Sequence, residues 1–540
     1  FLLGANDGVL PAAENRGGVL RDEDREALER QQIFLAPHGM EQFHLEIQNL
    51  YAALAQPTEK LTVSYPVSDG KGAEKRPSFV IGRIARLLPS ISVEAESADK
   101  EYRLSAKSTA LEYAGEHIGG ALWRYFEGQG DAERALAAMK DASRYTRGHL
   151  SRDAVRALYG GAVTLSASRM DMARSCHFAY FMRYGLKARE RTGAGFDAPQ
   201  IGTFVHDVME HTLRQAKECG GLHTLSKDKL HALVRASIEE YIDRVLPDLC
   251  EKSARFRYLF NRLCATVERI MDEVSEELQS SDFEPLAFEL EFGADGQLPA
   301  ITIREKNGTA RVVGKVDRVD GWLHDGKLYL RVVDYKTGKK SFDLAELRYG
   351  LGLQMLLYLF TLKEEGQMLF GGHEIVPAGV LYTPAREPML RCARDTEPEK
   401  IEKALKKELR RSGMVLEDPA VLQAMEHSAL ESPCYLPIAV KRDGAVTGSL
   451  ASAEQLGKLS KYVDHILHEI TQEVFAGNID ADPYARTPQQ SACTYCEFAS
   501  ACHFENGCGS DRMEYIKATK NDEFWQYIDE VNGEGAHENG

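Results

Sequence analysis

The spacing of apolar positions predicts alternating blocks of helix and strand along the chain. Apolar residues recur at helical spacing over 201–219, 228–278 and 452–475, whereas residues 288–342 follow the two-residue period of strands. A short strand at 163–165 leads into a helix that reaches 181, and residues 347–362 return to helix. The stretch 351–362 is too short for a membrane span and is interrupted by Gly352 and Gln354, so we expect a buried core helix. This mixture predicts an α/β protein with no membrane-spanning segment.

Composition and net charge limit how the protein could bind nucleic acid and which cell compartment it suits. The 540 residues carry a net charge of −16, so a protein that coats DNA through bulk attraction is disfavoured. A nuclease whose acidic residues hold cations remains compatible with this balance. The ten cysteines are too sparse for a disulfide scaffold, and no targeting segment is visible, which favours the cytoplasm. Because Phe1 lies in an apolar stretch without a basic leader, we expect a fragment that begins inside a domain.

One hairpin carries the most informative chemistry. Asp325-Gly326 stands between the β-branched runs 314–320 and 332–338, which is a strong signal for a two-residue turn. Counting outward from this turn places Asp317 directly opposite Asp334, with Lys336 on the same face as Asp334. The same register sets Asp320 against Arg331 on the other face, where a cross-strand salt bridge is expected.

Two carboxylates and a lysine on one face suit metal-assisted phosphodiester hydrolysis. Mg²⁺ prefers oxygen ligands and retains several waters. It can polarise a phosphate and lower the pKa of water, while a nearby lysine orients that water or stabilises developing charge. The alternative interpretation is a surface hairpin with an ordinary Asp–Lys pair.

Asp317 followed by Asp334-Tyr335-Lys336 resembles the PD-(D/E)xK nuclease motif in its RecB-like form. That form also has a histidine on an upstream helix and Gln-x-x-x-Tyr on the next helix, and His206, Gln354 and Tyr358 match both. The resemblance implies a restriction-endonuclease-like core with added helices. It further implies roles for the site residues: Mg²⁺ ligands at His206, Asp317, Asp334 and the Tyr335 carbonyl, water activation by Lys336, and strand orientation by Gln354 and Tyr358. Glu210, one turn after His206, fits a supporting role and a solvated helix face equally well.

A second motif is the C-x₂-C-x₅-C cluster of Cys493, Cys496 and Cys502. Three cysteines need a fourth ligand to complete a tetrahedral zinc site or a four-cysteine iron–sulfur cluster. The candidates for this fourth position are Cys176, His503 and Cys508. Spacing alone favours zinc in a cytosolic protein.

The order of all these elements is similar to that of AddB-type subunits of bacterial AddAB helicase–nucleases. In that family a distant upstream cysteine and a terminal C-x₂-C-x₅-C hold a [4Fe–4S] cluster around the nuclease domain. The segment 165–181 resembles the region of the first cysteine, which implies that Cys176 joins Cys493, Cys496 and Cys502. His177 departs from the family, which usually has proline there, and Cys508 is the alternative ligand. We expect a structural staple, because the ligands bracket the whole nuclease core.

The start of the chain resembles part of a superfamily 1 helicase domain. Residues 3–11 are similar to a late helicase strand, and in the segment 50–57 Gln56 stands where active helicases place an arginine that contacts the γ-phosphate of ATP. No G-x-x-x-x-G-K-[ST] loop is present, which leaves any ATP-binding loop to an upstream region. The resemblance implies four parts: a helicase-like remnant without ATP hydrolysis at 1–105, a helical connector at 106–160, the nuclease domain at 161–510 and a tail at 511–540.

Basic side chains offer candidate contacts to DNA phosphates. Arg183, Lys187, Arg189 and Arg191 follow the first cysteine, and Lys339 with Lys340 follow the hairpin. A third group, Lys403, Lys406, Lys407, Arg410 and Arg411, is interleaved with glutamates, and a solvated helix face is favoured for it.

The family resemblance implies a Mg²⁺-dependent DNA exonuclease subunit. It would form a heterodimer with an AddA-type helicase–nuclease, resect double-strand breaks for homologous recombination and cut the 5′-ended strand. One alternative is a stand-alone iron–sulfur exonuclease like the CRISPR-associated ones, against which the helicase-like remnant argues. The other is a catalytically idle scaffold that holds DNA, which has no need to keep Asp317, Asp334 and Lys336 together.

Overall fold

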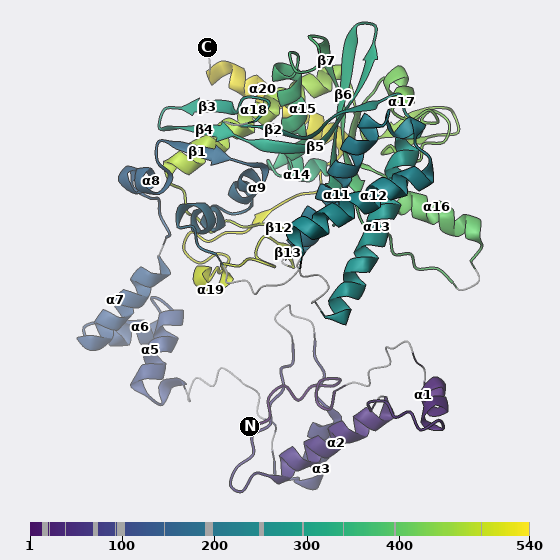
Figure 1. The fold of residues 1–540 in the computed structure, drawn as a ribbon. Helices are drawn as coiled ribbons and strands as arrows, with labels where there is room; N and C mark the ends of the chain where they lie inside the picture. Colours follow the sequence, from purple (N-terminus) through teal and green to yellow (C-terminus); the bar gives the residue numbers. More distant parts are fainter. Residues whose placement is uncertain are drawn as a thin grey trace. The chain divides into compact units, whose positions relative to one another are not determined.

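The structure is a computed structural model of the chain. It describes all residues except 13–19, 21, 38, 69–73, 92, 94–102, 145, 190–197, 248–252, 294–295, 339, 394–395, 488 and 539–540. Arg191, Lys339 and Cys250 therefore lie outside the described residues. The chain divides into two compact units, Phe1–Ala137 and Ala138–Gly540, and each is considered by itself (Figure 1).

The first unit is mainly helical in its described part. Its helices are α1 (Asp22–Glu29), α2 (Met40–Ala55), α3 (Phe79–Leu87), α5 (Lys107–Glu116) and α6 (Ala121–Phe126), and α7 (Asp131–Ser143) crosses the boundary between the units. The segment 3–11, expected to resemble a helicase strand, lies where Leu2 forms a parallel bridge with Val63 and Asn6 forms an antiparallel bridge with Pro77. The side chain of Asn6 is buried and ties this start of the chain to residues 66–76, because its Nδ2 donates to the carbonyls of Pro66 and Arg76 at 2.8 and 3.1 Å.

A six-stranded mixed sheet organises the second unit. Its strands are β2 (Glu284–Phe292), β5 (Gly314–His324), β6 (Lys327–Lys336), β7 (Glu374–Pro384), β8 (Ser412–Leu416) and β11 (Leu450–Ala451). Their order is β11-β8-β7-β6-β5-β2, with parallel pairing between β6 and β7 and between β8 and β11. The remaining neighbours are antiparallel. The expected mixed α/β fold is confirmed.

Smaller sheets flank this one. One has the order β1-β4-β3, from β1 (Ala162–Leu165), β3 (Ile301–Glu305) and β4 (Gly308–Val312). A hairpin joins β9 (Ile438–Val440) to β10 (Val446–Gly448), and a third sheet joins β12 (Tyr484–Thr487), β13 (Gln490–Ser491) and β14 (Glu514–Tyr515).

Several helices of the second unit pack on the main sheet. The described helices of this unit are α8 (Arg152–Tyr159), α9 (Ala167–Ser175), α10 (His177–Tyr180), the π-helical turn η1 (Phe181–Gly185), α11 (Ala198–Glu218), the 3₁₀ turn η2 (Leu222–Thr224), α12 (Lys227–Val245), α13 (Ala254–Gln279), α14 (Leu344–Arg348), α15 (Gln354–Glu365), α16 (Pro398–Glu408), α17 (Pro419–Met425), α18 (Ala453–Ala476), α19 (Ala499–Cys502) and α20 (Asn521–Glu538). Among them, α15 packs on β6 and β7, and α11 packs on β2. Figure 1 shows α11, α12 and α13 packed side by side. Among the described residues, no helix combines the length and apolar character that crossing a membrane requires.

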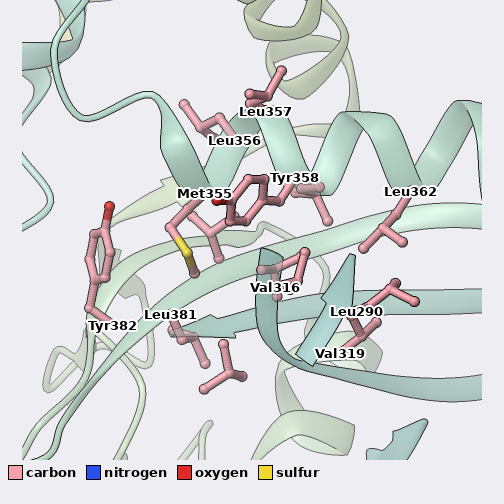
Figure 2. Packing of buried hydrophobic residues seen from close by; sticks show 14 of the residues in the cluster. Leu290, Val316, Val319, Met355, Leu356, Leu357, Tyr358, Leu362, Leu381 and Tyr382 are labelled. Atoms are coloured by element: carbon pink, nitrogen blue, oxygen red, sulfur yellow. The ribbon is translucent and has the colours of Figure 1, made fainter. Parts of the chain in front are cut away.

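The core helix α15 lies against the sheet. It begins at Gln354 because Gly350 and Gly352, with φ of 74° and 68°, hold the preceding chain in the left-handed region. Residues 355–362 are all buried, as expected for this stretch. Figure 2 shows Met355 and Leu362 directed toward the strands that carry Leu381 and Leu290.

The hairpin of β5 and β6 has the expected register. Asp325 and Gly326 form its turn with φ of 48° and 78°, the two positive values that a type I′ turn needs. Asp320 pairs with Arg331, and Arg331 Nε lies 2.8 Å from Asp320 Oδ2 as the predicted salt bridge. The ladder ends one step before Asp317 and Asp334, at the pair of Arg318 with Val333.

The basic helix differs from its prediction. α16 ends at Glu408, and none of its side chains is buried, which agrees with a solvated face. Arg410 and Arg411 lie beyond this helix, however, and Arg411 is buried against Glu277 with Nη2 to Oε2 at 2.6 Å. A guanidinium can be buried when a carboxylate compensates its charge.

Candidate active site

Three side chains from different elements meet at one end of the sheet. His206 lies on α11, Glu289 on β2 and Asp317 on β5, and one ligand atom from each lies within 4.8 Å of the others. Pairing in the β2–β5 ladder runs from Phe288–Arg318 to Leu290–Val316, which sets Glu289 beside Asp317. No other such group occurs among the residues that the structure describes.

His206 is held by two contacts of its ring. Nε2 lies 2.9 Å from the Tyr335 carbonyl oxygen and Nδ1 lies 3.3 Å from Asp317 Oδ2. The same Asp317 oxygen accepts the backbone N–H of Tyr335 at 2.9 Å. Burial lowers the pKa of His206, but the hydrogen bond and charge of Asp317 outweigh it and leave this pKa raised. The ring of His206 thus turns Nδ1 toward Asp317 and Nε2 toward the Tyr335 carbonyl.

Asp334 is turned toward Lys336. Lys336 Nζ lies 2.6 Å from Asp334 Oδ2, and Gln354 Nε2 donates to Asp334 Oδ1 at 3.4 Å. Gln354 Nε2 also donates to the Tyr358 hydroxyl at 3.3 Å, so the two residues share one helix face. Burial and the charge of Asp317 raise the pKa of Asp334 to about 6, against the opposing effect of Lys336. Burial raises the pKa of Tyr358 to about 12.

All the residues expected at the catalytic site are brought together, and Glu289 joins them. Sequence reasoning missed Glu289, which carries no motif and lies on a separate strand. Burial and the charge of Asp317 raise the pKa of Glu289, although Lys315 Nζ lies 2.6 Å from its Oε2. Glu210 contacts Arg214 at 2.8 Å, but its side chain is only 20% exposed and its charge acts on Glu289 and Lys315, so it lies beside the acidic group.

This donor set suits a hard divalent cation. Glu289 and Asp317 supply carboxylate oxygens beside the imidazole nitrogen of His206. Burial first, and then repulsion by the charge of Asp317, disfavour the charged form of Glu289. A cation placed among these atoms would relieve that repulsion. A cavity of about 560 Å³ lined by Lys315, Gln354 and Tyr358 adjoins this group.

The expected cysteines gather around a second cavity. Cys176, Cys493, Cys496 and Cys502 all line a space of about 690 Å³ whose walls are mainly apolar. Cys176 is buried and the other three are half-buried. Cys508 is exposed and does not line this space, whereas His503 does. The geometry therefore favours Cys176 over Cys508 as the partner of the C-x₂-C-x₅-C cluster.

The sulfurs of the cysteines that line this cavity are spread more widely than the ligands of one bound zinc ion. With Zn–S bonds of about 2.3 Å, the sulfurs of a tetrahedral zinc site lie ~3.8 Å apart. Among the described residues, no three cysteine sulfurs lie within 4.8 Å of one another. Burial raises the pKa of the Cys176 thiol to about 12.

His177, at the position where the resemblance led us to expect proline, has a structural role. Its backbone N–H donates to Asp482 Oδ1 at 2.9 Å, and its ring Nδ1 lies 2.6 Å from Asp482 Oδ2. The ring Nε2 lies 3.3 Å from Glu473. Burial lowers the pKa of His177, but these two carboxylates raise it to about 9. The ion pairs tie the turn after Cys176 to α18 and the segment that follows it.

Two arginines hold the terminal segment 493–511, which contains Cys493, Cys496 and Cys502. Arg147 contacts both carboxylate oxygens of Asp511, at 2.8 and 2.9 Å, and donates to the Cys502 carbonyl at 2.8 Å. Arg183 Nη1 lies 2.8 Å from Glu497 Oε1. This ion pair links Arg183 to the segment between Cys496 and Cys502, and contact of Arg183 with a DNA phosphate stays a prediction.

Comparison with known proteins identifies relatives of the chain. Residues 164–503 match the PD-(D/E)XK nuclease superfamily. The chain is 31% identical to a protein of Ruminiclostridium cellulolyticum and 32% identical to one of Acetivibrio thermocellus, in each case over 98% of the chain and 48% of the relative. Both relatives are named as one of the subunits of an ATP-dependent helicase/deoxyribonuclease. The chain thus spans about half the length of the curated relatives it matches.

Proposed function

The chain belongs to the PD-(D/E)XK nuclease superfamily, and on that premise we propose that it is the nuclease part of a metal-dependent deoxyribonuclease. The observation that carries this proposal is the group of His206, Glu289 and Asp317, whose ligand atoms lie within 4.8 Å of one another. Lys336 and Asp334 adjoin this group through the β5–β6 hairpin.

His206, Glu289 and Asp317 would hold Mg²⁺, with Asp334 and the Tyr335 carbonyl as further oxygen donors. When bound, Mg²⁺ polarises the phosphate and lowers the pKa of water. Lys336, held by Asp334, presents its ammonium to the attacking water or to the charge that develops on the phosphate. Gln354 holds Asp334 through its amide, and Tyr358 with Lys315 lines the approach for the DNA strand.

The cysteine cavity supports a [4Fe–4S] cluster held by Cys176, Cys493, Cys496 and Cys502. Cys176 and Cys493 are 317 positions apart, so the cluster would close a loop around the nuclease core. Its binding free energy would then contribute to folding, which is the role of a structural staple.

The relatives' name supports a place in a helicase–nuclease complex. We infer a heterodimer with an AddA-type helicase–nuclease that resects double-strand breaks for homologous recombination, in which this site cuts the 5′-ended strand. Residues 1–105 would be the remnant of a helicase-like domain without ATP hydrolysis, 106–160 a connector, 161–510 the nuclease domain and 511–540 a tail.

A DNA-holding scaffold is the alternative of a different class. The close group of His206, Glu289 and Asp317 disfavours a scaffold, because two neighbouring carboxylates repel each other unless a bound cation compensates their charge. A stand-alone iron–sulfur exonuclease is disfavoured because 98% of the chain aligns with a helicase/deoxyribonuclease subunit, at 31% identity.

The test is cleavage of end-labelled DNA with Mg²⁺ by the anaerobically purified complex, with the partner's own nuclease disabled. Asp334→Asn keeps the shape of the side chain and removes its charge, so we expect cleavage of one strand to fall at least about 100-fold. Asp325→Asn in the exposed turn of the same hairpin is the matched control and should stay within about 2-fold of wild type. Unchanged cleavage in Asp334→Asn would support the scaffold.

A further inference from the structure

Asp171 of α9 is a half-buried carboxylate that the proposed mechanism leaves unused. Its Oδ1 accepts the backbone N–H of Gly352 at 2.9 Å. Gly352 lies two positions before Gln354, which begins α15 and donates its amide to Asp334 Oδ1 at 3.4 Å. We propose that Asp171 is a positioning residue of the nuclease site, which fixes the start of α15 and thereby the amide of Gln354 on Asp334. This inference rests on the proposed nuclease function and adds to it a link to the helix that ends at the cysteine cavity.

The turn before α15 takes its acceptor from a remote part of the chain. Gly350 and Gly352 have φ of 74° and 68°, so their segment lies outside the hydrogen-bond ladder of the helix. Leu353, the N-cap residue of α15, is apolar and offers no side-chain acceptor to the first turn. A backbone N–H needs a partner, and a carboxylate near the N-terminus of a helix also suits the helix dipole. Asp171 supplies both.

A second side chain of α9 contacts the same turn. A Cβ at Gly350 would lie 3.0 Å from Arg174 Nε, so Arg174 packs directly over this glycine. Arg174 also pairs with Glu469 and with Glu473 of α18, the latter at 3.2 Å. Asp171 and Arg174 are three positions apart, so they lie on one face of the helix. That face of α9 therefore contacts the turn at two points.

The end of α9 is fixed by contacts of its own. Cys176 follows the helix directly and lines the cysteine cavity, and Asp171 lines it as well. The next residue, His177, contacts Asp482 through its backbone N–H at 2.9 Å and through its ring at 2.6 Å. A residue positions a catalytic group well when its own support is rigid. The helix that carries Asp171 meets this condition.

The segment before the turn is anchored by the sheet beside the terminal cysteines. Arg486 of β12 contacts Asp343 at 2.7 Å and Glu346 at 3.0 Å. The hydroxyl of Tyr349 donates to the carbonyl of Tyr515 in β14 at 3.3 Å. These contacts hold α14 in place, so the turn that follows it has a fixed start.

Asp171 also acts on nearby charges, which gives a competing explanation. Burial raises the pKa of Asp171, while the charges of Lys340 and Lys336 oppose this rise. By this second route, the charge of Asp171 would reach the catalytic lysine without any effect on Gln354. The two routes differ chemically, because an amide oxygen can replace a carboxylate as an acceptor but not as an anion.

The first experiment compares Asp171→Asn with Asp171→Ala in the full-length protein, within its complex and with the partner's nuclease disabled. Asparagine keeps an oxygen that accepts the Gly352 N–H, whereas alanine removes it. On end-labelled DNA with Mg²⁺, we expect Asp171→Asn to stay within about 2-fold of wild type. Asp171→Ala should lose about 10-fold in kcat, the size of one hydrogen bond to a charged group, with KM changed less than about 2-fold.

Asp418→Ala is the matched control for the loss of a backbone hydrogen bond. Asp418 is also half-buried and accepts the N–H of Ala420 at 2.8 Å, but at the start of α17. Its variant loses a cap of similar strength without touching the turn before α15. It should leave kcat within about 2-fold of wild type.

The second experiment asks whether Asp171 acts through Gln354. Gln354→Ala removes the amide that contacts Asp334, and it is combined with Asp171→Ala. Residues that act as one unit are not additive. Once residue 354 is alanine, Asp171→Ala should therefore change kcat less than about 2-fold. General damage to the fold would instead lower kcat about 10-fold in both backgrounds.

Hydrogen exchange gives a readout that does not depend on cleavage. The hydrogen bond to Asp171 protects the amide of Gly352. A peptide that covers residues 350–354 should exchange at least about 5-fold faster in Asp171→Ala than in wild type. In Asp171→Asn and in Asp418→Ala it should exchange at the wild-type rate.

Each outcome has a defined meaning. A lower kcat and faster exchange in Asp171→Ala, with recovery in Asp171→Asn and no added effect beside Gln354→Ala, support the inference. Equal losses in Asp171→Asn and Asp171→Ala assign the effect to charge, and an additive loss in the double variant assigns it to the fold. Either result overturns the inference while the nuclease function stands, as does failure of Asp171→Ala alone to assemble with the partner. Absence of cleavage by the wild-type complex overturns the proposed function and the inference with it.

Discussion

At the scale of single residues, Glu289 has an unusual backbone. Its φ of 49° lies in the left-handed region, which a non-glycine residue adopts rarely and at a cost of order 1–3 kcal/mol. Such strain persists where the surrounding structure holds it, and here the residue stands beside Asp317 and His206. Backbone strain and the close approach of Glu289 and Asp317 thus occur at the same position, as the proposed cation site requires.

We expect Glu289→Gln to lower the affinity for Mn²⁺, used as a spectroscopic substitute for Mg²⁺, about 10- to 100-fold. The amide keeps the volume of the side chain but removes the charge that attracts the cation. Titration calorimetry or electron paramagnetic resonance on the full-length protein measures this affinity. Glu291→Gln is the control, since Glu291 lies two positions on in β2 with a side chain that is 55% exposed. Equal affinities in the two variants would exclude Glu289 as a ligand.

The register of the β5–β6 hairpin could be predicted residue by residue, whereas the position of Glu289 beside Asp317 could not. The Asp325-Gly326 turn lies inside the segment whose pairing it sets, so counting from it reaches the Asp320–Arg331 pair. Glu289 meets Asp317 through a different ladder, whose register depends on packing of β2 against β5. No turn signal of that kind joins these two strands.

At the scale of elements, the junction of α9 and α10 presents Cys176 to the cysteine cavity. Cys176 adopts an extended backbone, with φ of −174° and ψ of 122°, and this interrupts the helix that was expected to run on to residue 181. His177 then begins α10 and is held by Asp482 and Glu473. The break in the helix is what turns the thiol toward the segment of Cys493 and Cys502.

If Cys176 is the fourth ligand, Cys176→Ser should lower the iron content of anaerobically purified protein to less than about half, because a four-iron cluster requires four thiolates. Cys508→Ser should retain the wild-type iron content, since Cys508 is exposed and lies outside the cavity lining. Iron analysis measures both. The reverse pattern would make Cys508 the ligand, and a zinc content of one per chain would replace the cluster by a zinc site.

At the scale of the whole fold, a buried charge network joins α13 to the sheet. Glu277 lies 2.6 Å from Arg411, 3.5 Å from Arg331 and 4.0 Å from Arg318. Arg318 also donates to the hydroxyl of Tyr335, whose carbonyl contacts His206. Burial raises the pKa of Glu277, but the three guanidinium groups outweigh it and lower the pKa to about 2. The network therefore supports the strand that carries Asp334.

We expect Glu277→Gln to lower the free energy of unfolding by ~3–5 kcal/mol, because it leaves buried guanidinium groups without a compensating charge. A carboxyl group whose pKa falls from 4.5 to about 2 on folding contributes stability above pH 4.5 and loses it as the pH falls toward 2. Denaturant unfolding across this range should thus show a smaller pH dependence in the variant. Glu276→Gln on the same helix is the control, and an equal loss in both would contradict this role.

By itself, the sequence determined the features that depend on neighbours along the chain. These are the hairpin register, the cap of α18 in which Ser452 and Gln455 bond reciprocally, and the spacing of the three terminal cysteines. The family resemblance extended this to His206, Gln354 and Tyr358, which the structure places beside the hairpin.

Only the tertiary structure decided which distant groups meet. Packing of β2 against β5 brings Glu289 beside Asp317, and burial against Glu277 removes Arg411 from the solvated surface. The physical reason is that local patterns set the conformation of a segment, whereas contacts between remote segments follow from how their apolar faces pack. Charge, burial and strain at these positions have meaning only once that packing is known.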